Sequence, residues 1–557
     1  MDKFKKILTN LLDQFLLVYF IFLLGFFVTD YAFIFKTGIS NLSVQGMIFV
    51  FLLAVRRCLD KASFGSSPLI KLLKRISKLG DAKILWLLSL VLTFLFLYIG
   101  IMRHFAFSSA GIDMGVTDQV IWNTIKGRFL FSSIDGHINH LGAHFEPVLL
   151  LIAPLYFVWP NIIILILLQA LAVGLAVFPL YLIAKKRLNN RSLVFAFILA
   201  YFLSRPLRGV GLLDFHNDAF LIPLSFTSYY LLITRRHLWA VVTMLLMLCC
   251  KESAAILVFA FGIFTITFLK RYRLGAFLLV LAISWWFMAT DLIMPAFANT
   301  TAYPYLKWLP FGTTYGDNLL AVAKDPMLLV KLLFSPQKLE FYLKLFLPLG
   351  LLSFLSPGHY VLFLLPLSAQ VAGSLNHAGM MTLTSHYPAH TLPFIFISAI
   401  YGAGRLIARR GERVSVYLAA VIIFLSLLFF GKSDGYKLSK FIRSADQLHS
   451  SGIRKALKKI PESASLCAVH RIAPHLTHRK FIYIWENSPD MRYLAEYVVL
   501  HRRLIETDKE RFNQLIIELR EKGFKEAYTD KYNDLFIFFN PMYKKEFLEN
   551  RQGRIII

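Results

Sequence analysis

The chain has few cysteines, few charged residues and little low-complexity sequence. Its four cysteines show none of the spacings that typify a disulfide framework or a zinc site: Cys58, Cys249, Cys250 and Cys467. Cys249 and Cys250 lie within an apolar run, where we expect them to pack. Only 17% of the 557 residues are charged, and we find no internal repeat. No convincing small-residue cleavage site follows the basic N-terminus, so we expect the first apolar span to be retained.

The chain is rich in apolar residues. Hydrophobic residues make up 57% of the chain, whereas soluble domains contain about 45–50%. Apolar runs of about 18 residues or more recur through positions 12–430, and such runs are typical of transmembrane helices. We therefore expect an all-α polytopic membrane protein with about thirteen transmembrane helices.

Basic residues outnumber acidic residues. Lysine and arginine total 60 against 33 acidic residues, which gives a net charge of +27. Much of this excess lies in short loops, such as 56–83 and 185–191, which the positive-inside rule places in the cytoplasm. We expect an integral inner (cytoplasmic) membrane protein with a cytoplasmic N-terminus. Its basic loops indicate membrane lipids as partners, and not nucleic acid.

The sequence predicts three regions. Residues 1–83 form a two-span extension with a basic cytoplasmic loop, and residues 84–430 form the main transmembrane domain with an outer loop at 103–160. Residues 431–557 change composition and predict a small extracytoplasmic α/β domain. In this tail we expect strands in SASLCAVHRI, FIYIW and AEYVVLH. We also expect an amphipathic helix ending near Gly523 and a closing strand pair in FKEAYTDKYNDLFIFFN.

The densest cluster of titratable groups in the transmembrane region lies at 109–147. It contains Asp113, Asp118, Asp135, His137, His140, His144 and Glu146. We predict a helix over 117–126 with Thr117 or Asp118 near its N-cap. Capping would explain only one of the two carboxylates at this point, Asp113 and Asp118. The following segment, 144–160, is apolar but short and proline-rich, and we expect it to lie in the outer interface.

Four further polar clusters fall on the same outer side of the predicted topology. They are Asp214, His216 and Asp218; Lys251 and Glu252; His386, Tyr387 and His390; and His475, His478 and Arg479. For Lys251 and Glu252 we weigh a cavity-facing role against a mutual ion pair. Acidic and imidazole groups gathered at one membrane surface indicate chemistry at that surface.

Several motifs carry a resemblance to a known family. GIDMGVTDQVIWNTIKG, HFEPVLLLIAPLYFVWP, LLDFHNDAF, KESAA and PHLTHR occur in that order. They resemble the motifs of the DUF2079 family of prokaryotic polytopic membrane proteins, from about residue 84 into the tail. That family in turn resembles the GT-C integral-membrane glycosyltransferases, which include the dolichyl-phosphate-mannose and aminoarabinose transferases. The resemblance implies a GT-C-like fold for residues 84–430.

The same resemblance implies an activity and roles for residues. The donor would be a polyprenyl-phosphate sugar, and the acceptor a lipid or glycan of the cell envelope. Asp113 matches the catalytic aspartate by position and Asp118 is the alternative, although Met114 stands where a second acid is expected. Donor-phosphate candidates are Lys251, Arg205, Arg208, His386 and Tyr387. Candidates for supporting the base or holding a divalent metal ion are Asp214, His216, Glu252, His144 and Glu146, and no cofactor is certain.

The sequence also fits two other functions. A transporter or flippase of an envelope lipid or polysaccharide needs polar or broken positions near the middle of several spans. Few such positions occur, and Gln169 and Gln370 are the candidates. A non-catalytic envelope assembly protein would instead depend on the tail. The clustering of titratable groups outside favours the enzyme.

Overall fold

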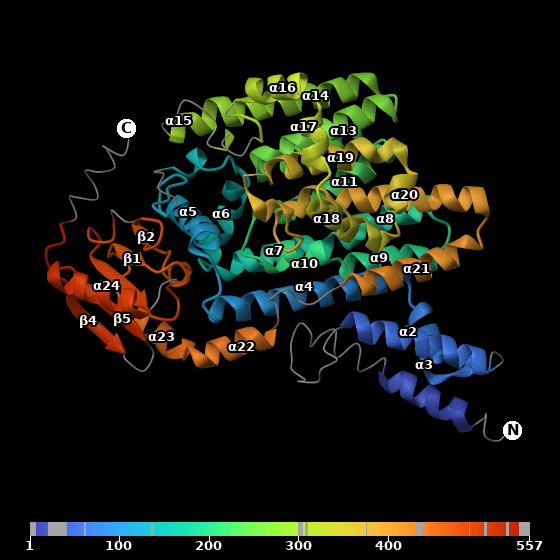
Figure 1. Cartoon of the computed structure of the whole chain (residues 1–557), viewed down its shortest axis with the longest axis horizontal. Coiled ribbons are helices and arrows are strands. Elements are labelled where there is room, and N and C mark those ends of the chain that lie inside the picture. Colours follow the sequence, from blue (N-terminus) through green and yellow to red (C-terminus); the bar gives the residue numbers. More distant parts are fainter. Residues whose placement is uncertain are drawn as a thin grey trace.

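The computed structural model describes residues 7–19, 42–60, 63–134, 139–298, 303, 305–306, 310–312, 314–374, 376–430, 438–488, 491–505, 509–530 and 534–544. Within them the chain is mostly helical, with a small sheet near the C-terminus (Figure 1). The predicted class is confirmed at that level. Asp135, His137 and most of the first predicted span lie outside the described residues.

Most of the described residues before the sheet are in α-helices. After a first helix, Ile7–Tyr19, they are α2 (Leu42–Leu59), α3 (Pro68–Ser77), α4 (Asp81–Phe105), α5 (Val116–Ile125), α6 (Val148–Val158), α7 (Ile163–Leu175), α8 (Val177–Arg187), α9 (Arg191–Phe202), α10 (Arg205–Leu212), α11 (Leu221–Ile233), α12 (His237–Cys250), α13 (Ala255–Thr267), α14 (Tyr272–Phe287), α15 (Met294–Ala298), α16 (Tyr315–Lys324), α17 (Met327–Leu333), α18 (Pro336–Phe346), α19 (Tyr360–Gly373), α20 (Leu392–Arg410), α21 (Val414–Leu428), α22 (Leu438–Gln447) and α23 (Ser450–Leu457).

Four of the described helices are long and apolar enough to cross a membrane: Asp81–Phe105, Ile163–Arg187, Tyr272–Ala298 and Leu392–Arg410. The pair α9 and α10, bent by 49°, adds a fifth if it forms one span. Other predicted spans correspond to shorter helices. The predicted span 341–354 is broken, because α18 ends at Phe346 and Gly350 adopts a left-handed φ of +63°. The count of thirteen therefore stays a prediction.

Helix α4 runs between two ends of the helical region, and an arginine–aspartate ion pair lies at each. The 25 residues of α4 span about 38 Å. Where α4 begins, Asp81 pairs with Arg191 at 2.7 Å, beside the basic end of α8. Where α4 ends, Arg103 pairs with Asp214 at 2.7 Å. Figure 1 shows the basic ends of α8 and α20 at the pole away from the sheet.

The tail is a mixed five-stranded sheet in the order β2-β1-β3-β5-β4. Its elements are β1 (Leu466–Ala468), β2 (Ile482–Ile484), β3 (Tyr497–His501), α24 (Lys509–Glu521), β4 (Lys525–Asp530) and β5 (Leu535–Phe539). Strand β1 pairs in parallel with β2 and β3, and β5 pairs antiparallel with β3 and β4. The strands and the helix that the sequence predicted are confirmed, and Gly523 follows α24 with a φ of +84°.

The tail packs against the loop 103–160 and shares a core with it. Buried apolar residues of α5, α6 and the sheet form one continuous cluster. The side chain of Gln119 donates to the backbone carbonyl of Arg479 at 3.2 Å. Ser133 exchanges hydrogen bonds with the backbone of Ile482 in β2, at 2.7 and 2.9 Å. The tail therefore helps to hold in place the loop that carries the candidate acids.

Candidate active site

A cavity of about 650 Å³ lies at the pole opposite the basic helix ends and collects residues from four of the predicted clusters. Of the predicted site residues it is lined by Asp113, His144, Glu146, His216, Lys251, Glu252, His386 and Tyr387. Segments far apart in the sequence thus meet at one place. The cavity volume lies within the range of small-molecule sites, about 300–1,000 Å³.

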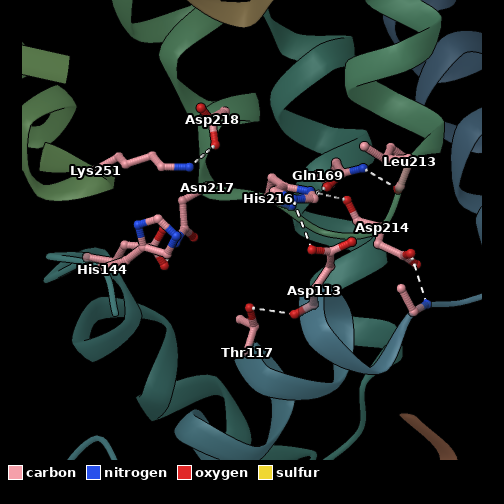
Figure 2. Close-up of polar contacts among 12 residues, drawn as sticks. Asp113, Thr117, His144, Gln169, Leu213, Asp214, His216, Asn217, Asp218 and Lys251 are labelled. Atoms are coloured by element: carbon pink, nitrogen blue, oxygen red, sulfur yellow. Dashed lines mark hydrogen bonds and ion pairs between the residues drawn. The ribbon is translucent and has the colours of Figure 1, made fainter. Parts of the chain in front are cut away.

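Asp113 stands on a π-helical turn, Gly111–Gly115, that leads directly into α5. Its side chain is 34% exposed, and its Oδ1 lies 3.7 Å from Nε2 of His216 (Figure 2). Nδ1 of His216 lies 2.8 Å from the backbone carbonyl of Asp214. A carbonyl only accepts, so Nδ1 carries a proton, and Nε2 is the ring nitrogen that faces Asp113. The aspartate and the histidine therefore form a close pair on the cavity wall.

Asp214 supports this pair without lining the cavity. Its two oxygens accept from the two terminal nitrogens of Arg103 at 2.7 and 3.0 Å, and one also accepts from the backbone of Ala110 at 2.9 Å. This bidentate clamp ties the loop before Asp113 to the end of α4. Gln169 holds the other side, because its amide bonds the backbone of Leu213 and of His216, each at 3.0 Å (Figure 2).

Lys251 lies at the break between α12 and α13. Its Nζ is 3.4 Å from Oδ2 of Asp218, whose Oδ1 is 3.5 Å from Nδ1 of His390. Burial raises the pKa of Asp218, but Lys251 and the nearby histidines lower it below its usual value. Burial lowers the pKa of Lys251, but Asp218, Glu146 and Glu252 raise it above its usual value. Both groups are therefore charged at neutral pH.

Glu252 pairs with residues 144 and 145, and the described residues show no direct ion pair between Glu252 and Lys251. Its Oε1 lies 3.1 Å from Nδ1 of His144, and its Oε2 accepts from the backbone of Phe145 at 3.1 Å. The hydroxyl of Tyr305 lies 2.9 Å from Nε2 of His144. Tyr303 and Tyr305 belong to a long loop in which nothing in the sequence marked them for a site.

Glu146 is held in the same wall of the cavity. It accepts a hydrogen bond from the side chain of Asn217 at 2.8 Å and lies 3.4 Å from Nε2 of His140. Burial raises the pKa of Glu146, but His140 and the other nearby cations lower it below its usual value. The wall therefore presents carboxylates that are already held by hydrogen-bond partners.

His386 and Tyr387 close the cavity from the short helix before α20. The ring of His386 stacks on that of His216, with centroids 3.8 Å apart and planes 15° apart. Burial lowers the pKa of His386, so its ring is neutral at physiological pH. Burial raises the pKa of Tyr387 to about 12, so its hydroxyl keeps its proton and remains a donor.

Asp118 lies elsewhere, and the expectation that it caps the helix is wrong. Helix α5 begins at Val116, so Asp118 is already in its first turn, and no side chain caps the helix. Asp118 is 1% exposed and accepts from the hydroxyl of Tyr156 at 2.7 Å and from that of Thr477. The π-helical turn ahead of α5 and the docked tail together direct it away from Asp113.

The remaining predicted residues lie outside the cavity. Arg205 is in α10, and Arg208 is buried with its guanidinium 3.9 Å from the centre of the Phe430 ring. Arg479 donates to the backbone carbonyls of Leu476, Pro461 and Ala464 and so shapes the tail. His475 and His478 lie around a second cavity together with Asp118.

The described residues contain no group of three or more histidine, cysteine or acidic side chains arranged to hold a metal ion. The candidates for such a role are each paired within the protein, as Asp214 is with Arg103 and Glu252 with His144. The arrangement supports proton transfer and anion binding by side chains.

Comparisons place the chain among known proteins. The crystal structure of ArnT from Cupriavidus metallidurans in the apo state is 11% identical, has a TM-score of 0.47, and covers 82% of this chain and 98% of that chain. The same protein bound to undecaprenyl phosphate is 12% identical, also has a TM-score of 0.47, and covers 83% and 98%. No curated protein sequence matches. The family described as "Predicted membrane protein (DUF2079)" matches residues 103–532, so the chain belongs to the DUF2079 family of membrane proteins.

Proposed function

We propose that this protein is a GT-C-type membrane glycosyltransferase that moves a sugar from a polyprenyl-phosphate donor to a lipid or glycan acceptor of the cell envelope. One observation carries the proposal. The partly exposed carboxylate of Asp113, its partner His216 and the buried cation Lys251 line the same cavity. A base and a cation in one pocket are what transfer from a phosphate leaving group requires.

The reaction divides between two sides of the cavity. Asp113 accepts the proton of the acceptor hydroxyl, and His216 shares that proton through its Nε2. The acceptor oxygen then forms a bond to the anomeric carbon. The bond between that carbon and the phosphate oxygen breaks, and its electron pair leaves with the polyprenyl phosphate. Lys251 stabilises the negative charge that develops there, and Tyr387 donates a hydrogen bond.

The lining also offers a place for the donor lipid. Pro366 and Ala369 of α19, together with Met380, give one side of the cavity an apolar surface. An apolar wall beside Lys251 suits a ligand whose phosphate is attached to a hydrocarbon chain. The polar groups would then orient the sugar while the apolar wall takes the first isoprene units.

The basic pole supports the predicted orientation. Lysines and arginines occupy the last turns of α8 and α20, and these helix ends lie at the pole away from the sheet (Figure 1). The positive-inside rule puts that pole in the cytoplasm. The cavity and the tail would then face the outside, where envelope acceptors are found.

The test uses the purified full-length chain in liposomes with a panel of polyprenyl-phosphate sugars. A donor that binds the folded state raises the apparent stability by about 2.7 kcal/mol at a hundredfold excess over its Kd. We expect one donor to stabilise the protein and to lose its sugar to an envelope lipid. Asp113→Asn should abolish transfer, whereas the exposed control Asp317→Asn should not. Full transfer by Asp113→Asn refutes the proposal.

A further inference from the structure

A second cavity, of about 680 Å³, lies where the tail meets the helices. Its walls come from the end of α4, from α5, from the link between α6 and α7, from α23 and from residues 474–479. None of the residues that line it also lines the cavity of Asp113. Helix α5 borders both, with Asp113 before its start on one cavity and Asp118 on the other.

A carboxylate and a histidine form a fixed pair in this second cavity. Oδ2 of Asp118 lies 3.1 Å from Nε2 of His478, and the hydroxyl of Tyr156 fixes Oδ1 at 2.7 Å. The ring of His478 is parallel to that of Trp122 within 11°. The carboxylate is 1% exposed, whereas the imidazole is 32% exposed to the cavity. Burial lowers the pKa of His478, but Asp118 raises it above its usual value, which favours the imidazolium.

Another part of the lining is basic. Helix α23 supplies Arg454 and Lys455, and Lys458 follows its last residue; Arg454 is half-buried and the two lysines are exposed. A terminal nitrogen of Arg454 donates to the backbone carbonyl of Phe105 at 3.0 Å, which anchors this wall to α4. Glu462 is the one exposed acid among the described lining residues. The cavity is therefore electropositive, although its floor holds a buried carboxylate.

One of the side chains that line this cavity also contains a buried polar atom without a partner among the described residues. Nε2 of His475 is buried and has no hydrogen-bond partner among the described residues, and the side chain lines the cavity. Buried polar atoms are normally paired, so such an atom calls for a ligand or an ordered water. We infer that this second cavity binds the phosphate group of a ligand between the basic face of α23 and His478. Cations on both sides of the group would replace its hydration shell with charge-assisted hydrogen bonds.

The surroundings indicate where that phosphate comes from. Beside the cavity, the end of α6 exposes Phe157, Val158 and Trp159, with exposed fractions of 72%, 86% and 47%. Aromatic and apolar side chains exposed in this way are typical of the membrane interface, where lipid headgroups lie. A lipid phosphate reaches the cavity from that interface, whereas a soluble phosphate ester would enter from the aqueous side of the tail.

The experiment measures binding and does not depend on sugar transfer. The full-length protein in phosphatidylcholine nanodiscs is titrated with phosphatidic acid, with the soluble headgroup analogue glycerol 3-phosphate, and with diacylglycerol as the lipid without phosphate. The test variant is the double substitution Lys455→Glu and Lys458→Glu, at two exposed positions. Its matched control is Lys522→Glu and Lys525→Glu, which changes the charge equally at two exposed lysines with the same spacing.

We expect phosphatidic acid to bind and diacylglycerol not to bind. The test variant should weaken binding about tenfold or more, and the control should not. His478→Gln should also weaken binding, because it removes the imidazole that faces the phosphate. Binding of phosphatidic acid alone identifies a lipid phosphate, and binding of glycerol 3-phosphate as well identifies a site for phosphate esters in general. Absence of binding by both, or equal binding by wild type and test variant, overturns the inference.

Discussion

Replacing Lys251 with methionine should destabilise the protein strongly, because it leaves Asp218 charged and buried. Asp218 is 1% exposed, and its Oδ2 is 3.4 Å from Nζ of Lys251. At an effective dielectric constant of about 20, two unit charges at that distance attract by about 5 kcal/mol. Removal of one partner of a buried pair typically costs about 3–5 kcal/mol. We expect a loss of this size in the free energy of unfolding.

The partner substitution should cost less. Asp218→Asn leaves Lys251 with Glu146 and Glu252, both of which also raise the pKa of the lysine. The double variant, Lys251→Met with Asp218→Asn, should be more stable than Lys251→Met alone, because no unpaired charge remains. The measurement is a denaturant titration of the four proteins in one detergent. Destabilisations that simply add, with no coupling energy between the two sites, would refute the assignment of a buried ion pair.

The pair should make stability insensitive to pH near neutrality. The folded-state pKa of Asp218 is lowered, so its contribution is present above its unfolded pKa of about 3.9 and is lost only as pH falls through the folded value. The folded-state pKa of Lys251 is raised, so its contribution is present below about 10.4 and is lost only as pH rises through the folded value. Between about pH 5 and 9 the contribution of this pair is constant. A wild-type stability advantage over the double variant that varied within that window would contradict this account.

Three further predictions concern other parts of the molecule. Arg103→Gln should reduce sugar transfer at least tenfold while donor binding persists, because the clamp on Asp214 is lost and the loop of Asp113 shifts; unchanged kcat would contradict this. Gly402→Ala should lower the free energy of unfolding by about 1–3 kcal/mol, because the new Cβ overlaps the backbone of Leu352 in a neighbouring 3-10 turn. Equal thermal stability of the variant and the wild type would contradict this prediction. Asp118 raises the folded-state pKa of His478, so the pairing of the two residues stabilises tail docking fully below about pH 6.5, and this contribution is lost as pH rises through the folded value. Hydrogen exchange in β2 of the wild type should therefore accelerate at high pH by more than the intrinsic exchange rate does. The acceleration should be smaller in His478→Gln.

The tail shows what sequence patterns predict well. Its strands and helix follow local rules, namely alternating apolar residues in short runs and an amphipathic period that ends at Gly523. The meeting of Asp113, His216, Lys251 and His386 followed from a different regularity. Each lies at a helix end on the side that the basic loops leave open, so a topology drawn from lysine and arginine already put them on one surface.

Other parts of the site depend on contacts that no local pattern encodes. Asp118 is five residues from Asp113, yet the π-helical turn and the docked tail give it Tyr156 and a separate cavity. Arg208 lies in α10, beyond the bend of 49° that separates α9 from α10, and packs on Phe430 instead of lining the cavity of Asp113. Tyr305 enters the site from a loop with no distinctive motif. Such placements are fixed by tertiary packing, which pairs residues far apart in the chain.

The most direct test compares the two candidate bases, Asp113 and Asp118, in one assay. The release of free polyprenyl phosphate and the transfer of sugar are measured for Asp113→Asn and Asp118→Asn, each normalised to the amount of folded protein. We predict that Asp113→Asn loses turnover while donor binding remains. Asp118→Asn should lower stability, because a buried hydrogen-bonded carboxylate is replaced, but should keep turnover per folded molecule. Turnover that survives in Asp113→Asn and disappears in Asp118→Asn would contradict the account and move the reaction to the second cavity.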